Sequence, residues 1–112
     1  MWLGWSRFHR VPPPAKRACR VYNVVWLDPF SQAEWPISVT VAFYPNGRPC
    51  EVFAQLEKSS STLDAALIAS ARMMSHLLQR GVKVRDLAHI VGEYGSPVDV
   101  LPKALLFAEG RL

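Results

Sequence analysis

The sequence predicts an α+β fold, a three-stranded antiparallel meander with two C-terminal helices packed on one face of the sheet. Three observations predict it: an alternating apolar segment that begins at Ile37, a turn that contains Asn46 and Gly47, and a long helical pattern that ends at Gly81. A chain of 112 residues is long enough to bury about two-thirds of its unfolded surface in one domain. We therefore expect one hydrophobic core.

The first strand is predicted from Cys19 to Leu27. One of its faces carries Val21, Asn23, Val25 and Leu27, and the other carries Arg20, Tyr22, Val24 and Trp26. Because both faces are apolar, we expect this strand to be central in the sheet or to be covered by a second subunit. A loop with two prolines, 28–36, then leads to the second strand.

The second and third strands form a hairpin. Apolar and polar residues alternate from Ile37 to Phe43, which is typical of a strand with one buried face. In the turn that follows, Gly47 is suited to the left-handed conformation that closes a type I turn with a bulge. The return strand is predicted from Cys50 to Leu56, and we expect Phe53, on its more polar face, to meet a second layer.

Helical patterns occupy the C-terminal half. The first runs from Ser61 to a stop at Gly81, and a shorter one follows within 82–91, so the two are expected to form a hairpin over the sheet. The segment 97–110 predicts a further turn or two of helix with Pro102 at its first position. Its apolar residues are expected to dock on the body or on another subunit, and they are Leu105, Leu106 and Phe107.

The order of these pieces resembles a known family. The alternating strand, the Asn-Gly turn, the string P-C-E-V-F, the helix start K-S-S-S-T-L and the helix end L-L-Q-R-G-V are similar to the TSCPD domain at the C-terminus of adenosylcobalamin-dependent ribonucleotide reductases. The resemblance covers about residues 37–91, although the chain lacks a T-S-C-P-D string. It implies an accessory module, because the radical-bearing cysteines and the substrate-binding barrel of the reductase belong to other domains.

Charge divides the chain unevenly. Residues 1–20 contain five basic residues and no acidic one, whereas the remainder contains eight basic and nine acidic residues. We therefore expect three segments: a basic, proline-containing arm at 1–18, the TSCPD-like domain at 19–95 and an apolar tail at 96–112. The residues expected to contact a partner are Trp2, Trp5, Arg7, Arg10, Lys16, Arg17 and Arg20.

The arm admits two kinds of partner. Aromatic residues between arginines suit stacking on bases with contacts to phosphates, and they suit equally burial in a protein groove. A solvated arm, or one that packs on its own domain, is the structural alternative.

The sequence predicts no catalytic, cofactor-binding or metal-binding residues. It has no glycine-rich phosphate loop, nucleophile elbow or metal-ligand spacing. We expect Cys19 and Cys50 to be reduced and structural, and a metal site would require the scattered His9, His76 and His89 to converge.

Two functions follow from these observations. The first is a non-catalytic accessory or interaction module that acts within a larger assembly or a homo-oligomer. The alternative is a small nucleic-acid-binding protein that uses the basic arm, and an enzyme is the third choice. No apolar segment approaches the roughly 20 residues that span a bilayer, so we expect a cytoplasmic protein that does not contact the membrane.

Overall fold

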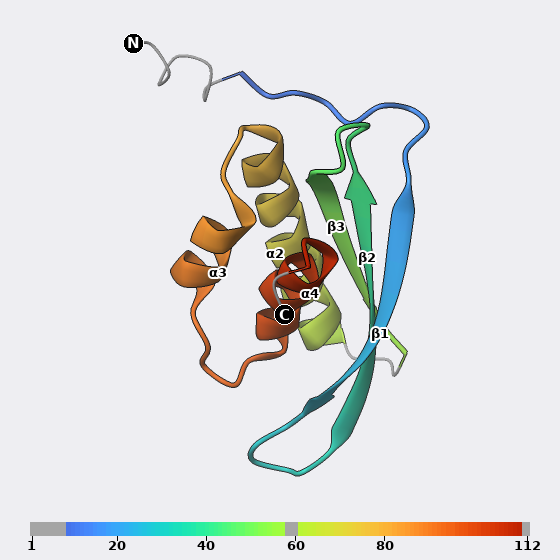
Figure 1. Ribbon diagram of the computed structural model, residues 1–112. Helices are drawn as coiled ribbons and strands as arrows, with labels where there is room; N and C mark the ends of the chain where they lie inside the picture. The colour runs from blue at the N-terminus through green and yellow to red at the C-terminus, as the bar shows by residue number, and fades with distance from the viewer. Residues whose placement is uncertain (1–8, 58–60, 111–112) are drawn as a thin grey trace.

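The computed structural model describes residues 9–57 and 61–110. Within them, a three-stranded antiparallel sheet in the order β1-β2-β3 is followed by helices, as Figure 1 shows, and the predicted fold class is confirmed. The elements are β1 (Cys19–Leu27), β2 (Glu34–Phe43), β3 (Pro49–Leu56), α2 (Ser61–Gln79), α3 (Val84–Val91), a short 3₁₀ helix η1 (Pro97–Asp99) and α4 (Val100–Ala108).

The predicted alternation in β2 places one face of the sheet in the core. Ile37, Val39 and Val41 are at most 1% exposed. Val52 and Leu56 of β3 are buried beside them, because the register pairs Val41 with Val52 and Ile37 with Leu56. Side chains of paired residues point to the same face, so one period-2 pattern in each strand builds a continuous apolar layer.

The turn between β2 and β3 has the predicted form. Gly47 adopts φ +89°, and its N–H donates to the carbonyl of Tyr44 at 2.9 Å. The N–H of Tyr44 donates to the carbonyl of Arg48 at 2.8 Å, and the register shifts between Ala42 and Phe43 as expected for a bulge. The hairpin prediction is confirmed.

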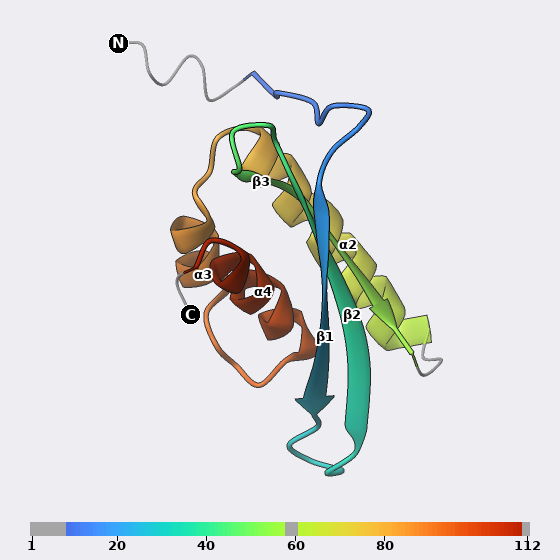
Figure 2. The same ribbon diagram turned by 45° about the vertical axis from the view of Figure 1, so that its right-hand side comes forward.

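The predicted loop 28–36 is wrong in its last three residues, because Glu34, Trp35 and Pro36 belong to β2. Pro36 lies opposite Val25, and its backbone faces β3, since the Glu57 N–H donates to the Pro36 carbonyl at 3.1 Å. Pro36 lies opposite Glu57, one residue beyond the end of β3, so the lack of an N–H on proline removes a bond only at the margin of the sheet. The β1–β2 ribbon consequently projects beyond the helices (Figures 1 and 2).

The first strand does not occupy the central position that its apolar faces suggested. β1 is an edge strand, and it pairs only with β2 among the residues that the structure describes. Its Tyr22, Val24 and Trp26 face the core side, whereas Val21 and Val25 are each 60% exposed. Apolar residues on both faces of this strand therefore mark an uncovered surface.

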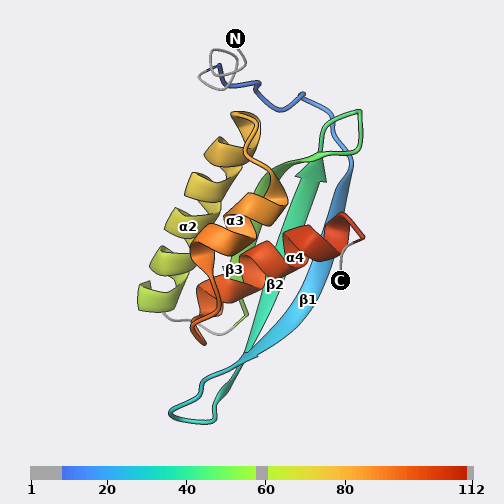
Figure 3. The same cartoon turned by 60° about the vertical axis from the view of Figure 1, so that its left-hand side comes forward.

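Helices cover one side of the sheet and one of its edges. Figure 3 shows α2 beside β3, at the far side of the sheet from β1, with α4 crossing the sheet. α2 ends at Gln79, and Gly81 (φ +94°) is the predicted stop residue beyond it, where the Val82 N–H donates to the Leu77 carbonyl at 3.0 Å. None of the described helices is long and apolar enough to cross a membrane.

The helix that lies on the sheet together with α2 is α4, and α3 packs chiefly against α4. α4 begins at Val100, two residues before Pro102, and its Leu101 and Leu105 are completely buried in the core. The opposite face of the sheet has no second layer in the described part of the chain, and Phe53 is 47% exposed, so the expectation for Phe53 is wrong.

Candidate interaction surface

The arm, from Arg10 onward, lies against the body of the protein. The Arg10 Nε donates to the side-chain oxygen of Gln79 at the end of α2. The Val11 N–H donates to the Gln79 carbonyl at 2.8 Å, and the Tyr44 hydroxyl donates to the Val11 carbonyl at 2.5 Å. Burial raises the pKa of the Tyr44 phenol, which keeps this donor protonated. The arm is thus bound to both α2 and the β2–β3 turn.

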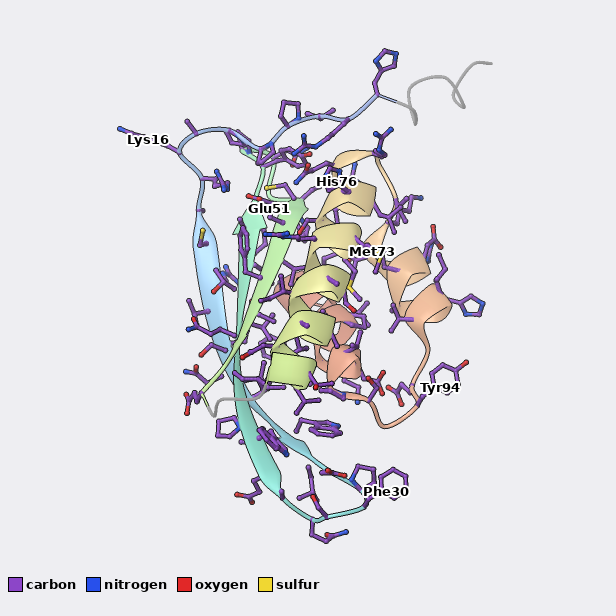
Figure 4. The ribbon with its side chains drawn as sticks, turned by 180° about the vertical axis from the view of Figure 1, so that it is seen from behind. Lys16, Phe30, Glu51, Met73, His76 and Tyr94 are labelled. Atoms are coloured by element: carbon purple, nitrogen blue, oxygen red, sulfur yellow. The ribbon has the colours of Figure 1, made fainter. Side chains whose placement is uncertain are left out.

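The basic residues of the arm and Arg20 at the start of β1 differ in their surroundings. Arg17 forms an ion pair with Glu51 of β3 at 2.6 Å and donates to the Pro14 carbonyl at 2.7 Å. Lys16 is exposed and points away from the body (Figure 4), and the exposed Arg20 has its guanidinium 5.7 Å from the centre of the Phe43 ring. The other candidates, Trp2, Trp5 and Arg7, lie outside the described residues.

Side chains of α2 close the outer edge of β3. The Ser75 hydroxyl accepts from the Val52 N–H at 3.0 Å, and its hydrogen is within reach of the carbonyls of Ala71 (2.8 Å) and Val52 (3.1 Å). The Gln79 side-chain amide donates to the Cys50 carbonyl at 3.0 Å. Ser75 and Gln79 are 7% and 2% exposed, so they replace the strand or the water that an open edge would bind.

The outer edge of β1 has a different character. The Phe43 N–H donates to the Ala18 carbonyl, and the Asp28 N–H donates to the Ala33 carbonyl. Between these two bonds, β1 and β2 pair without a register shift. Bonding alternates along an antiparallel strand, so the even-numbered residues of β1 face β2 and the odd-numbered residues present their N–H and C=O groups to the free edge. These residues are Cys19, Val21, Asn23, Val25 and Leu27.

A groove of about 840 Å³ runs along this edge, between β1 and α4. Its walls include Tyr22 and Trp26 of β1 and Phe107 of α4. The Phe107 ring is 56% exposed and meets the Tyr22 ring edge-on at a centroid distance of 5.5 Å. The Trp26 indole N–H donates to the Gly95 carbonyl at 2.9 Å, which joins β1 to the loop before η1 beside the groove.

The cysteines and histidines of the described residues do not line this groove. Both cysteines are free, with Cys19 exposed and Cys50 buried, and burial raises the pKa of the Cys50 thiol so that it stays protonated at neutral pH. His9, His76 and His89 are exposed. Across residues 9–57 and 61–110, no group of three or more His, Cys, Asp or Glu residues is placed to hold a metal ion.

The loop at the projecting end of the β1–β2 ribbon is held by local hydrogen bonds. At the projecting end, the Asp28 carboxylate accepts from the N–H of Phe30 at 2.9 Å, and this bond lowers the pKa of Asp28. Phe30 is 96% exposed at the loop tip, where Figure 4 shows its ring pointing away from the body. The loop is therefore shaped by a local carboxylate–amide turn and not by packing.

This architecture defines a small α+β domain that is built on a three-stranded meander, with one sheet edge closed by a helix and the other left unpaired by the described residues. The chain belongs to the TSCPD domain family, whose model matches residues 17–105. That family is associated with the C-terminal region of vitamin B12-dependent ribonucleotide reductases. Comparisons with curated proteins and with solved structures gave no match.

The family assignment confirms the resemblance and widens it. The resemblance was visible over about 37–91, whereas the match begins before β1 and extends into α4. Sequence reasoning missed the roles of Ser75 and Gln79. Their spacing of four residues, adjacent to the apolar stripe of Ala71, Met74 and Leu78, is the signal that could have placed both on the buried side of the helix.

Proposed function

We propose that this chain is a non-catalytic accessory module that acts in the cytoplasm within a larger protein assembly. The observation that carries the proposal is the uncovered face of the sheet. Val21 and Val25 of β1 are each 60% exposed there, and Phe53 of β3 is 47% exposed. Val21, Thr40 and Phe53 lie in one row across the three strands. Apolar residues gathered on a sheet face favour a protein partner.

Family membership indicates the kind of partner. Because the TSCPD family is associated with vitamin B12-dependent ribonucleotide reductases, the proposed assembly contains the catalytic chain of such a reductase. In this assembly the module contributes binding surface, and the reductase supplies the chemistry.

Binding to the reductase tests this proposal. The purified chain, mixed with an adenosylcobalamin-dependent reductase from the same source, is expected to form a complex in size-exclusion chromatography with light scattering. Phe53→Lys is expected to weaken the complex at least tenfold, because it places a charge among the apolar residues of the uncovered face. Ile90→Lys, at a position on α3 that is 70% exposed, is the matched control and should bind like the wild type. No complex, or equal binding by Phe53→Lys, would reject the proposal.

Nucleic-acid binding by the arm is the second candidate, and the charge distribution favours it, with five basic and no acidic residues in 1–20. If Arg10 and Arg17 keep their bonds to Gln79 and Glu51, three of the five charges remain for phosphates. The expected slope of log K against log salt for duplex DNA is then about −3, and not the value near −5 expected when all five bind phosphate.

Fluorescence anisotropy with a labelled duplex measures this slope. The double variant Lys16→Ala and Arg20→Ala should reduce binding strongly, while Arg17→Ala, which removes the ion pair to Glu51, should change it little. If Trp2→Ala with Trp5→Ala abolishes partner binding and the double basic variant does not, the arm binds a protein groove, since buried aromatics anchor interfaces. Binding without salt dependence would reject the nucleic-acid function.

A further inference from the structure

We infer that two copies of this chain pair through the free edge of β1, antiparallel and about a two-fold axis, to form a continuous six-stranded sheet. The inference rests on the proposed role as an interaction module and names one of its partners, a second copy. Strand pairing of this kind satisfies the unpaired backbone groups of an edge and extends the uncovered face across both copies.

The two edges of the sheet differ in a way that identifies β1 as the pairing strand. The edge of β3 is closed by Ser75 and Gln79 of α2. β1 has none of the features that usually protect an edge, because it contains no proline, has no bulge against β2 and has a single charged residue, Arg20. At nine residues it is also longer than a typical strand of about five or six.

The outward-facing residues of β1 are self-complementary. The sequence of its free-edge positions is apolar, apolar, polar, apolar, apolar, and the pattern is symmetric about Asn23. A two-fold axis at Asn23 gives the largest overlap and places Val21 opposite Val25 of the second copy. On the core side, the same register places Arg20 opposite Trp26 of the second copy, a pairing of guanidinium and indole that is favourable.

The charge on β1 does not oppose this pairing. In the register centred on Asn23, the two copies of Arg20 are six positions apart along the strands, which corresponds to roughly 20 Å. This separation exceeds the Debye length of about 8 Å at physiological ionic strength. Repulsion between the two arginines is therefore screened.

The area buried between the two copies determines how tightly they bind. The strand edge alone buries too little, so the interface must include α4. A nine-residue strand is roughly 30 Å long and a sheet roughly 10 Å thick, so the edge alone supplies about 300 Å² per copy. A stable interface buries about 800 Å² per partner. The two-fold axis places both α4 helices on the same face of the joined sheet, where Phe107 and the groove of each copy face one another across the axis. Even with this contribution, we expect a dissociation constant on the order of micromolar.

Sedimentation velocity of the full chain over a micromolar concentration series tests the dimer. The wild type is expected to show a reversible monomer–dimer equilibrium. Asn23→Pro removes a free-edge N–H, and Phe107→Lys places a charge in the groove, so each should raise the dissociation constant at least tenfold. Phe53→Lys, on the uncovered face at the other side of the sheet, should leave it unchanged. Circular dichroism checks folding, and Val25→Lys replaces Asn23→Pro if that variant does not fold.

Disulfide cross-linking tests the register, in a Cys19→Ser background. Asn23→Cys should cross-link to its own copy on mild oxidation, because residues in a hydrogen-bonded antiparallel pair have Cα atoms about 5.5 Å apart, within the range of a disulfide. Val21→Cys is the matched control on the same face. Its two copies would be four positions apart, roughly 14 Å, so it should cross-link only when mixed with Val25→Cys.

A wild-type protein that is monomeric throughout the series would overturn the inference. So would a dimer that survives both Asn23→Pro and Phe107→Lys and is lost in Phe53→Lys, since that dimer would use the uncovered face. Cross-linking of Val21→Cys equal to that of Asn23→Cys would reject the register. These experiments omit the reductase, so their failure leaves the proposed accessory role to be decided by the separate binding test.

Discussion

Leu105→Ala is expected to lower the free energy of unfolding by about 2–5 kcal/mol, because the Leu105 side chain is completely buried and its loss leaves a cavity. The matched variant is Phe107→Ala, two residues further along α4. Phe107 is 56% exposed, and its truncation should cost less than about 1.5 kcal/mol, mainly through the lost edge-on contact with Tyr22. Guanidinium denaturation of dilute protein measures both.

This comparison decides whether 96–112 is a separable tail. Leu101, Ala104 and Leu105 share one core cluster with residues of β2 and α2, so deleting the segment 97–112 should unfold the domain, given a typical total stability of about 5–15 kcal/mol. A cooperative unfolding transition in the deletion variant, or equal and small losses for Leu105→Ala and Phe107→Ala, would show that the segment is dispensable.

Ser75→Ala is expected to lower the free energy of unfolding by about 1–3 kcal/mol, and Gln79→Leu by a similar amount. Each substitution leaves a buried backbone group of β3 without its partner, the Val52 N–H in one case and the Cys50 carbonyl in the other. Gln79→Leu also removes the acceptor for Arg10 and so releases part of the arm.

Ser70→Ala is the control for these two variants. Ser70 lies on the same helix and is half-buried, and the structure gives no bond from it to β3 among the described residues. Its replacement should change the midpoint little, because alanine is the better helix former. If Ser75→Ala and Ser70→Ala had the same midpoint, α2 would not be closing the edge of β3 through hydrogen bonds.

The strands, the turn and the long helix were predictable because their signals are local. Alternation from Ile37 to Phe43 specifies a half-buried strand whatever lies on top of it, and Gly47 and Gly81 mark positions where the backbone takes a positive φ. The same local patterns carried the family resemblance. The resemblance was visible in the hairpin and α2, and the family match extends it to β1 and into α4.

The amino-acid sequence alone therefore determined the spans of the strands, the turn between β2 and β3, and the start and stop of the long helix. The tertiary structure alone decided which helix covers the sheet, which edge α2 closes and which arginines of the arm are bound. α4 is the clearest case, because Leu101 and Leu105 are buried in the core while Phe107 is exposed. The run of three apolar residues at 105–107 does not by itself show which of them is buried. Burial of a short helix and pairing of Ser75 or Arg17 depend on residues more than twenty positions away, so only the folded arrangement determines them.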